Sequence, residues 1–236
     1  MNLVFFGPFD RRAPAVNPPR SPEVHYWLED FAQWNDPEPA DLALLDPDEK
    51  DRAEKLRFPR DRRRFILGRK FIRQTCADYL RIEPADVRLT LGQYGKPSLA
   101  PPSNLRFSIS HCGDLLLAAF AMGREVGVDL ETAQRHIDVA GTSEIVCCAS
   151  EREKLHHLDP AGQIAAFLRN WTLKEAYTKA LGIGHQQPFD QIEASILPTD
   201  PPFVSVIGNS NSQSNWIAFE PNLGRVNFHA AIVCEQ

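Results

Sequence analysis

The segment Gly127-Val128-Asp129-Leu130-Glu131 predicts a β-strand that is polar on one face and apolar on the other. Side chains alternate along a strand, so Val128 and Leu130 point toward a core while Asp129 and Glu131 share an opposite, exposed face. Neighbouring carboxylates repel each other unless a cation lies between them, and a hard divalent ion such as Mg²⁺ prefers oxygen ligands. A strand with a solvated outer face gives the same pattern, and this segment alone favours that interpretation.

A second segment, Trp171-Thr172-Leu173-Lys174-Glu175-Ala176-Tyr177-Thr178-Lys179-Ala180, predicts a helix that carries a carboxylate and a cation together. Glu175 and Lys179 are four residues apart and are therefore neighbours on the helix surface, with Trp171 one turn before them as an apolar anchor. Such a pair is also a common stabilising feature of helices, worth about 0.2–0.5 kcal/mol. The combination of the two segments, rather than either one, indicates a charged site.

The order of elements predicts an α+β fold. Helical periodicity covers residues 61–80 and 164–181, and a shorter helix begins near residue 47. Strands are expected at 1–8, 87–91, 107–110, 115–121, 126–130, 189–196, 203–207, 216–219 and 227–233. Proline-rich stretches at 8–22 and 35–47 predict loops. Each half has one long helix followed by several strands, without a β-α-β rhythm, which favours the α+β class.

The composition is that of a globular protein, with 236 residues, 43% apolar residues, 24% charged residues and a net charge of -5. The longest apolar run, residues 115–122, is too short to cross a bilayer, and the N-terminus lacks the pattern of a signal peptide. We therefore expect a cytoplasmic protein with no membrane partner. The five cysteines form no C-x-x-C pair, which predicts reduced thiols and no zinc site.

Positive charge is concentrated in residues 50–73, where 11 Lys/Arg face three Asp/Glu. This charge can be a solvated helix face, or a surface for a polyanion such as a phosphate ester or a nucleic acid. Further candidate phosphate donors lie in turns, namely Lys96 before Pro97, and Ser110-His111 at the end of a strand. Adjacent residues of an extended chain point in opposite directions, so Ser110 and His111 are better phosphate donors than a nucleophile–base pair.

Together these motifs resemble those of 4'-phosphopantetheinyl transferases of the surfactin-synthetase-activating (Sfp-like) class. The signatures of that family, G-[VI]-D-[ILV]-E and W-[ST]-x-K-E-[AS]-x-x-K, are both present in full at residues 127–131 and 171–179. The chain also resembles the family in three further segments, namely the arginine helix at 64–69, the G-K-P turn at 95–97 and the strand at 107–111. The chain departs from the family at Val146-Cys147-Cys148, where relatives usually have an aromatic pair, and in a polar insert at 208–215.

The resemblance implies two similar α+β lobes related by pseudo-twofold symmetry, residues 1–123 and 124–236, with coenzyme A in the cleft between them. It implies that the nucleotide and its phosphates are bound by Arg64, Lys96, Pro97, Ser110, His111 and Lys179. It further implies that Mg²⁺ is held by Asp129, Glu131 and Glu175, and that Glu175 and Lys179 are catalytic. Glu175, or a water on the metal, would take the proton from the attacking serine of an apo acyl or peptidyl carrier protein. The products would be a holo carrier protein and adenosine 3',5'-bisphosphate, and a monomer is expected.

Two other functions stay open on the residues alone. A nucleic-acid-binding module could use residues 50–73, but it would leave the carboxylates of the two motif segments unused. A Mg²⁺-dependent phosphohydrolase would use the same carboxylates with water as the nucleophile. The resemblance favours the transferase, so no nucleic acid is expected as a partner. The carrier protein is expected to dock on residues around the end of the second-lobe helix and in the segment 137–158.

Overall fold

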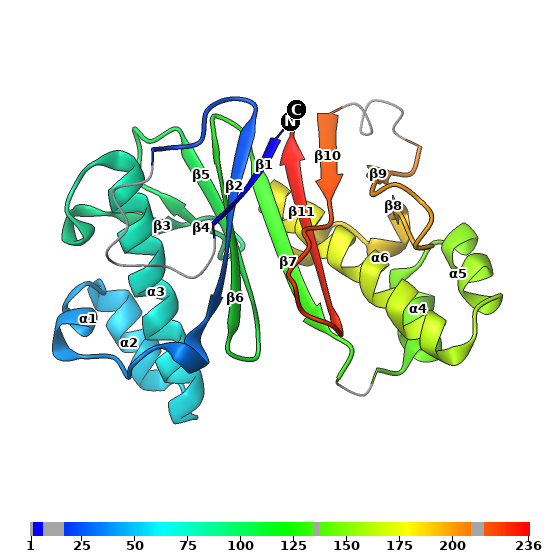
Figure 1. Cartoon of the computed structure of the whole chain (residues 1–236), viewed down its shortest axis with the longest axis horizontal. Coiled ribbons are helices and arrows are strands. Elements are labelled where there is room, and N and C mark those ends of the chain that lie inside the picture. Colours follow the sequence, from blue (N-terminus) through cyan, green and yellow to red (C-terminus); the bar gives the residue numbers. More distant parts are fainter. Residues whose placement is uncertain (1, 7–16, 135–136, 209–214) are drawn as a thin grey trace.

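The computed structural model describes residues 2–6, 17–134, 137–208 and 215–236, and in this part of the chain the elements form four layers. Two long helices, α3 (Pro59–Leu80) and α6 (Pro160–Leu181), lie on opposite outer sides of a pair of β-sheets (Figure 1). One sheet has the strand order β1-β2-β6-β5 and the other has the order β10-β11-β7. Each lobe is thus a long helix on a sheet, and the two sheets face each other in the middle of the molecule.

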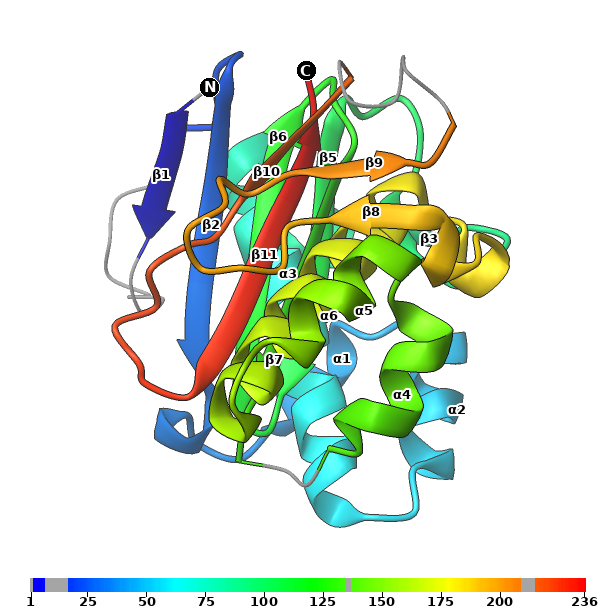
Figure 2. The same ribbon diagram turned by 90° about the vertical axis from the view of Figure 1, so that its right-hand side faces the viewer.

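The remaining elements complete these lobes. The strands are β1 (Asn2–Phe6), β2 (Glu23–Asp30), β3 (Leu89–Leu91), β4 (Pro97–Leu99), β5 (Leu105–Cys112), β6 (Leu115–Met122), β7 (Val126–Thr132), β8 (Ile192–Ala194), β9 (Val204–Val206), β10 (Trp216–Phe219) and β11 (Phe228–Glu235). The shorter helices are α1 (Pro39–Ala43), α2 (Pro47–Lys55), α4 (Val139–Val146) and α5 (Ala149–His156), with 3₁₀ turns at Phe31–Gln33, Pro84–Asp86, Gly184–Gln186 and Phe189–Gln191. Figure 2 shows α6 running along β7 and β11, with α4 and α5 further from the sheet.

Strand β6 is buried on both faces, which explains its continuous apolar run. Leu116, Ala118 and Phe120 pack toward α3 in the core of the first lobe. The alternate residues, among them Leu117 and Ala119, pack toward the second sheet. A strand enclosed on both sides is apolar at every position rather than at every second one.

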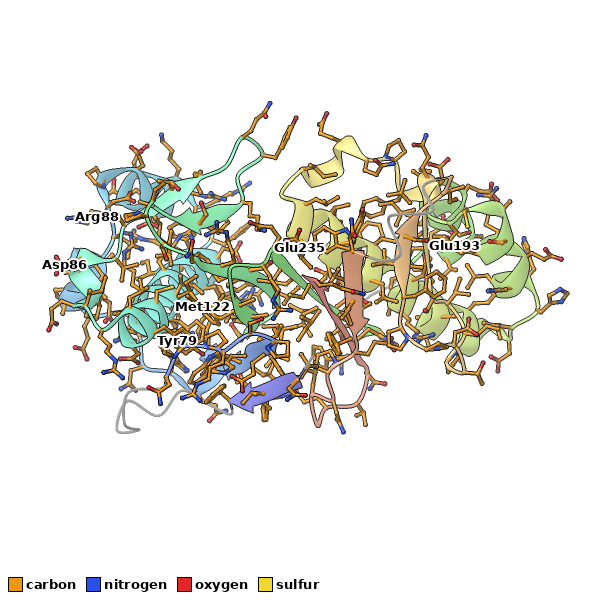
Figure 3. The ribbon with its side chains drawn as sticks, turned by 90° about the horizontal axis from the view of Figure 1, so that it is seen from above. Tyr79, Asp86, Arg88, Met122, Glu193 and Glu235 are labelled. Atoms are coloured by element: carbon orange, nitrogen blue, oxygen red, sulfur yellow. The ribbon has the colours of Figure 1, made fainter. Side chains whose placement is uncertain are left out.

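The core between the sheets joins the two lobes. It combines the inward-facing residues of β2 and β6 with Val126, Val128 and Leu130 of β7 and with alternate residues of β11. Figure 3 shows Glu235, from β11, in the middle of the molecule, while Tyr79 and Glu193 lie in opposite lobes. The expected inward direction of Val128 and Leu130 is therefore confirmed.

The α+β class and the two similar lobes are confirmed, and so are the two long helices. α6 begins at Pro160, before the expected start, because the Asp159 side chain accepts a hydrogen bond from Gly162 N at 2.8 Å and caps the first turn. The lobe boundary between residues 123 and 124 stays a prediction. Most of the insert at 208–215 and the proline-rich residues 8–16 lie outside the described residues.

Several elements were not predicted. Strand β2 follows the first proline-rich stretch and pairs with β6, with Tyr26 opposite Ala119. Helix α1 lies within residues 35–47, where only a loop was expected, and it begins with reciprocal bonds between Glu38 and Asp41. Helices α4 and α5 lie between the two motif segments. None of the helices in the described part of the chain is both long enough and apolar enough to span a bilayer.

Three cations of the basic region at residues 50–73 are buried and neutralised inside the first lobe, while most of the others are exposed. Arg69, Lys70 and Arg73 are 8%, 4% and 2% exposed. Lys70 Nζ lies 2.5 Å from Asp41 Oδ1, and Arg73 Nη2 lies 2.6 Å from Glu49 Oε2. These three cations belong neither to a solvated face nor to a surface for a polyanion, because the helix turns them toward carboxylates of α1 and α2.

Candidate functional site

The two motif segments touch each other at Gly127. α6 crosses β7 so closely that a Cβ atom added to Gly127 would lie 1.9 Å from the backbone oxygen of Ala176 and 2.3 Å from the backbone nitrogen of Ala180. Ordinary contacts begin at 3.4 Å, so a residue with a side chain does not fit here without moving the helix. The polar face of β7 therefore lies directly under the helix that carries Glu175 and Lys179.

A compact polar cluster joins three elements at this crossing. Asp129 Oδ1 of β7 accepts a hydrogen bond from Ser110 Oγ of β5 at 2.8 Å and one from Lys179 Nζ of α6 at 2.6 Å. Lys179 Nζ also donates to Ser110 Oγ at 3.1 Å. The structure thus brings together residues that lie up to 69 positions apart in the sequence, and the charged partners strengthen these hydrogen bonds.

Asp129 is buried, with 4% of its surface exposed. The expectation of an exposed face for Asp129 is wrong, because α6 covers that face of β7. Burial of a charged carboxylate is unfavourable unless it is paired, and the Lys179 ammonium supplies the pairing. Asp129 consequently holds the cluster together as well as offering an oxygen to a ligand.

Small polar side chains allow the edges of the two sheets to meet beside the cluster. Ser108 Oγ of β5 accepts a hydrogen bond from the backbone nitrogen of Val128 at 3.2 Å. This contact satisfies a backbone donor on the edge of β7. Ser108 and Ser110 are two residues apart and so face β7 together.

The three carboxylates expected to bind Mg²⁺ do not surround a common point here. Among the described residues no three His, Cys, Asp or Glu side chains are grouped closely enough to hold a metal. The chemistry of the donors nevertheless fits the ion, since carboxylate oxygens are ligands of Mg²⁺ together with waters and substrate phosphates. One observation supports this fit: Asp129 Oδ2 is buried and has no hydrogen-bond partner in the described part of the chain.

His111 points away from Ser110, as the alternation along a strand predicts. Its Nε2 atom would lie 3.2 Å from a Cβ atom added to Gly68, so the imidazole rests against the backbone of α3. Desolvation by the surrounding protein lowers the pKa of His111, because it disfavours the charged imidazole. Repulsion from Lys179, Arg69 and Arg64 lowers it further, to about 4. The residue is nevertheless exposed to solvent.

Two of the predicted phosphate-binding cations are held by carboxylates. Arg64 Nε donates to Asp114 Oδ1 at 2.7 Å, in the turn that follows β5. This hydrogen bond is the main reason why the pKa of Asp114 lies below its usual value. Lys96 Nζ contacts Glu125 Oε2 at 2.9 Å. These pairs leave the cofactor-binding roles of Arg64 and Lys96 as predictions.

A pocket of about 310 Å³ opens beside the cluster. Its walls come from the turn between β3 and β4, from β5 and from the end of α6. The lining residues are Tyr94, Gly95, Lys96, Pro97, Ser108, Ile109, Glu175, Thr178, Lys179, Gly182 and Gly184. Lys96, Pro97, Glu175 and Lys179, which sequence reasoning singled out from distant segments, therefore share one pocket.

Known proteins with similar sequences identify the family. A family model described as the 4'-phosphopantetheinyl transferase superfamily matches residues 125–233, and one described as 4'-phosphopantetheinyl transferase, N-terminal, matches residues 32–122. The 4'-phosphopantetheinyl transferase HetI of Nostoc sp. is 35% identical over 184 residues, which are 77% of this chain and 77% of HetI. The chain belongs to the 4'-phosphopantetheinyl transferase superfamily.

Other members of the superfamily are more distant or longer. The human L-aminoadipate-semialdehyde dehydrogenase-phosphopantetheinyl transferase is 31% identical over 189 residues, which cover 73% of this chain and 58% of the human protein. Sfp of Bacillus subtilis is 24% identical, over 66% of this chain and 68% of Sfp. A crystal structure of a holo-(acyl-carrier-protein) synthase from Bacillus anthracis in complex with CoA (3',5'-ADP) aligns with a TM-score of 0.38 at 22% identity, over 47% of this chain and 94% of that one.

One residue of the transferase motif has a structural position that sequence reasoning did not find. Lys174 is fully buried, and its Nζ donates to Glu151 Oε2 at 2.6 Å, to Val146 O at 2.7 Å and to Phe189 O at 3.0 Å. It therefore clamps α4, α5 and the 3₁₀ turn before β8 onto α6, one residue before Glu175. Glu151, the acceptor of Lys174, also caps the start of α5 through the backbone nitrogen of Cys148. The spacing of these two residues is that of a capping box, and it is the signal in the sequence that could have marked Glu151 as a structural carboxylate.

Proposed function

We propose that this chain transfers the 4'-phosphopantetheine group of coenzyme A to a serine hydroxyl of an acyl or peptidyl carrier protein and releases adenosine 3',5'-bisphosphate. The observation that carries the proposal is the cluster of Ser110, Asp129 and Lys179, of which Lys179 lines the 310 Å³ pocket. Membership of the superfamily supports the type of reaction. Assignment to its Sfp-like class, a monomeric state and a cytoplasmic location belong to the same proposal and rest on the resemblance.

Lys179 is the best placed cation for a phosphate of coenzyme A. Its side chain is 32% exposed and lines the pocket. An ammonium group has three protons, and Asp129 and Ser110 accept two of them. The third can be donated to a phosphate oxygen without breaking the cluster. Ser110 and Asp129 thus orient the Lys179 ammonium toward the substrate.

His111, Arg64 and Pro97 are proposed to complete the cofactor site. Neutral His111 can donate one ring proton to a phosphate oxygen, and it gains a second donor if it becomes protonated. Arg64 has five N–H groups, so it can keep its bond to Asp114 and still present further donors to an anion. Pro97 supplies an apolar part of the pocket wall, which suits a nucleotide base or the pantetheine arm.

The reaction requires a proton acceptor near the attacking serine. The serine Oγ forms a bond to the phosphorus that carries the pantetheine arm, and the bond from that phosphorus to the bridging oxygen breaks. Glu175 lines the pocket one helical turn before Lys179, and its carboxylate is proposed to take the hydroxyl proton. Lys179 stabilises the negative charge that develops on the oxygens.

Asp129, Glu131 and Glu175 are the residues proposed to hold Mg²⁺. When bound, the ion would neutralise charge on the pyrophosphate of coenzyme A. The unpartnered, buried Oδ2 of Asp129 supports this assignment.

The proposal is tested by incubating the full chain with coenzyme A, Mg²⁺ and separate apo carrier proteins, and by measuring the mass of each carrier. We expect one phosphopantetheine group per carrier, attached to serine, and an equal amount of adenosine 3',5'-bisphosphate. Release of the bisphosphate without any carrier would instead indicate a phosphohydrolase. Absence of both products with all carrier types would overturn the proposal.

A further inference from the structure

The turn between β3 and β4 is fastened to the second lobe through one ammonium group. Lys96 Nζ donates to Glu125 Oε2 at 2.9 Å, to Ala180 O at 2.8 Å and to Val126 O at 3.3 Å. Ala180 and Val126 belong to the end of α6 and the start of β7. An ammonium group has three protons, so these three acceptors use its full donor capacity.

The main chain after α6 is shaped to receive this turn. Gly182 has a φ of 68°, and a Cβ atom added to it would lie 3.2 Å from Lys96 Cδ. A Cβ atom added to Gly184 would lie 3.4 Å from Tyr94 Cβ. Two glycines therefore leave room for the Lys96 stem and for Tyr94, so the fit between the turn and the end of α6 involves packing as well as charge.

The charges around Lys96 favour this position. The carbonyl end of a helix carries partial negative charge, which attracts a cation. Glu125 also accepts a hydrogen bond from Arg106 Nε at 2.9 Å, so its carboxylate is shared between two cations. The Lys96 side chain is only 18% exposed, which reduces solvent screening of these contacts. Lys179, by comparison, is more exposed and has fewer acceptors.

Lys96 also lies between two pockets of the surface. Lys96 and Gly182 line the 310 Å³ pocket beside Lys179, and the same two residues line a neighbouring pocket of about 650 Å³. The second pocket contains Arg106 and Glu125. The contact between the turn and the end of α6 is therefore the partition between these pockets.

We propose that Lys96 is a positioning residue rather than a phosphate ligand: it pins residues 92–97 to the end of α6 and thereby sets the shape of the coenzyme A pocket. This inference rests on the proposed function and assigns the residue within the same site. The pinned helix turn carries Lys179, which is adjacent to Ala180. Loosening the pin changes both the pocket wall and the position of the cation that faces the substrate.

The test uses Lys96→Met, which keeps most of the stem and removes the ammonium, with coenzyme A and 3'-dephospho-coenzyme A as alternative substrates. Loss of one charged hydrogen-bonding group is expected to lower kcat/KM by about 10-fold to 100-fold. A positioning role predicts the same factor for both substrates, with part of the loss in kcat. A loss confined to the KM of coenzyme A, with 3'-dephospho-coenzyme A unaffected, would show that Lys96 binds the 3'-phosphate and would overturn the inference.

Hydrogen exchange of the free protein gives a readout that does not depend on transfer. Lys96→Met is expected to speed exchange in residues 92–97, while Lys55→Met, at an exposed lysine of α2, leaves these residues unchanged. An unchanged rate of hydrogen exchange in Lys96→Met would overturn the inference that Lys96 holds residues 92–97 against the end of α6. If the wild-type chain transfers nothing, the proposed function fails, and the exchange experiment still decides whether the pin exists.

Glu125→Gln provides a second variant at a half-exposed carboxylate. A positioning role predicts that this change weakens the pin, lowers kcat/KM and speeds exchange in residues 92–97. The kcat/KM of the double variant with Lys96→Met should be little lower than that of Lys96→Met alone, because both changes break the same contact. If Lys96 were a phosphate ligand restrained by Glu125, Glu125→Gln would free the ammonium and tighten coenzyme A binding, which is the contrary result.

Discussion

Gly127→Ala tests whether the direct contact of α6 with β7 maintains both stability and the site. The new Cβ atom would lie 1.9 Å from the backbone oxygen of Ala176, so the helix must move outward by about 1.5 Å to restore the 3.4 Å of ordinary contact. Overpacking of this kind typically costs about 1–3 kcal/mol. We expect about 3 kcal/mol, the upper end, because backbone atoms cannot rotate away as a side chain would.

The same displacement affects transfer. Lys179 lies on the displaced helix and Asp129 on the fixed strand, so their 2.6 Å hydrogen bond would lengthen beyond bonding range. Misplacement by about 1 Å can reduce a catalytic rate roughly 100-fold, and we expect a loss of that order in kcat.

Urea unfolding at constant m-value measures the free-energy change, and carrier mass spectrometry measures the rate. Gly92→Ala is the matched control, because its Cβ atom would lie 3.5 Å from the nearest neighbour, Lys96 O. We expect that control to change the free energy of unfolding by at most about 0.5 kcal/mol. If Gly127→Ala lies within about 1 kcal/mol of the wild type and keeps its turnover, the contact is not required and the explanation is refuted.

Three further predictions concern the proton acceptor, the imidazole and the carrier surface. Glu175→Gln should lower kcat while the Kd of coenzyme A by calorimetry stays within about threefold; equal turnover in both proteins would contradict a role as base. Neutral His111, whose pKa is about 4, should gain a proton near bound phosphate, because an anion raises its pKa. Coenzyme A binding should therefore tighten as pH falls from 7 toward 5, and less so in His111→Gln; identical pH profiles would refute this. Ile145, a 74% exposed residue of α4, should contact the carrier, so Ile145→Asp should raise the KM of the carrier but not of coenzyme A, whereas Ile82→Asp in the other lobe should change neither.

The sequence was most informative where the local pattern and the tertiary environment agree. The helix at 61–80 was predicted because its apolar residues repeat at helical spacing, and it forms within two residues of that range. A strand was predicted at 115–121, and burial on both faces explains why its residues do not alternate between apolar and polar. Strand β2 was missed because its pairing partner, β6, lies about ninety residues away and gives no local signal.

Of the site, the sequence predicted the residue types better than their partners. Asp129, Glu175 and Lys179 could be selected from two motifs, but the bond from Lys179 to Ser110 depends on how β5 meets α6. The acceptors of Lys96 include two backbone carbonyl oxygens. Every residue has such an oxygen, so no residue type marks these two in the sequence. Burial of Asp129 likewise depends on where α6 crosses the strand.

The alternation along β7 gives its two faces different tasks. Val128 and Leu130 fill the core between the sheets, and this requires only apolar side chains of suitable size. Gly127 and Asp129 face α6, and the absence of a side chain at the first lets the helix come near enough for Lys179 to reach the second. With a larger residue at position 127, Asp129 would gain solvent and lose its ammonium partner. The glycine and the aspartate of this motif are therefore linked by geometry, because the position of the charge depends on the space left by the missing side chain.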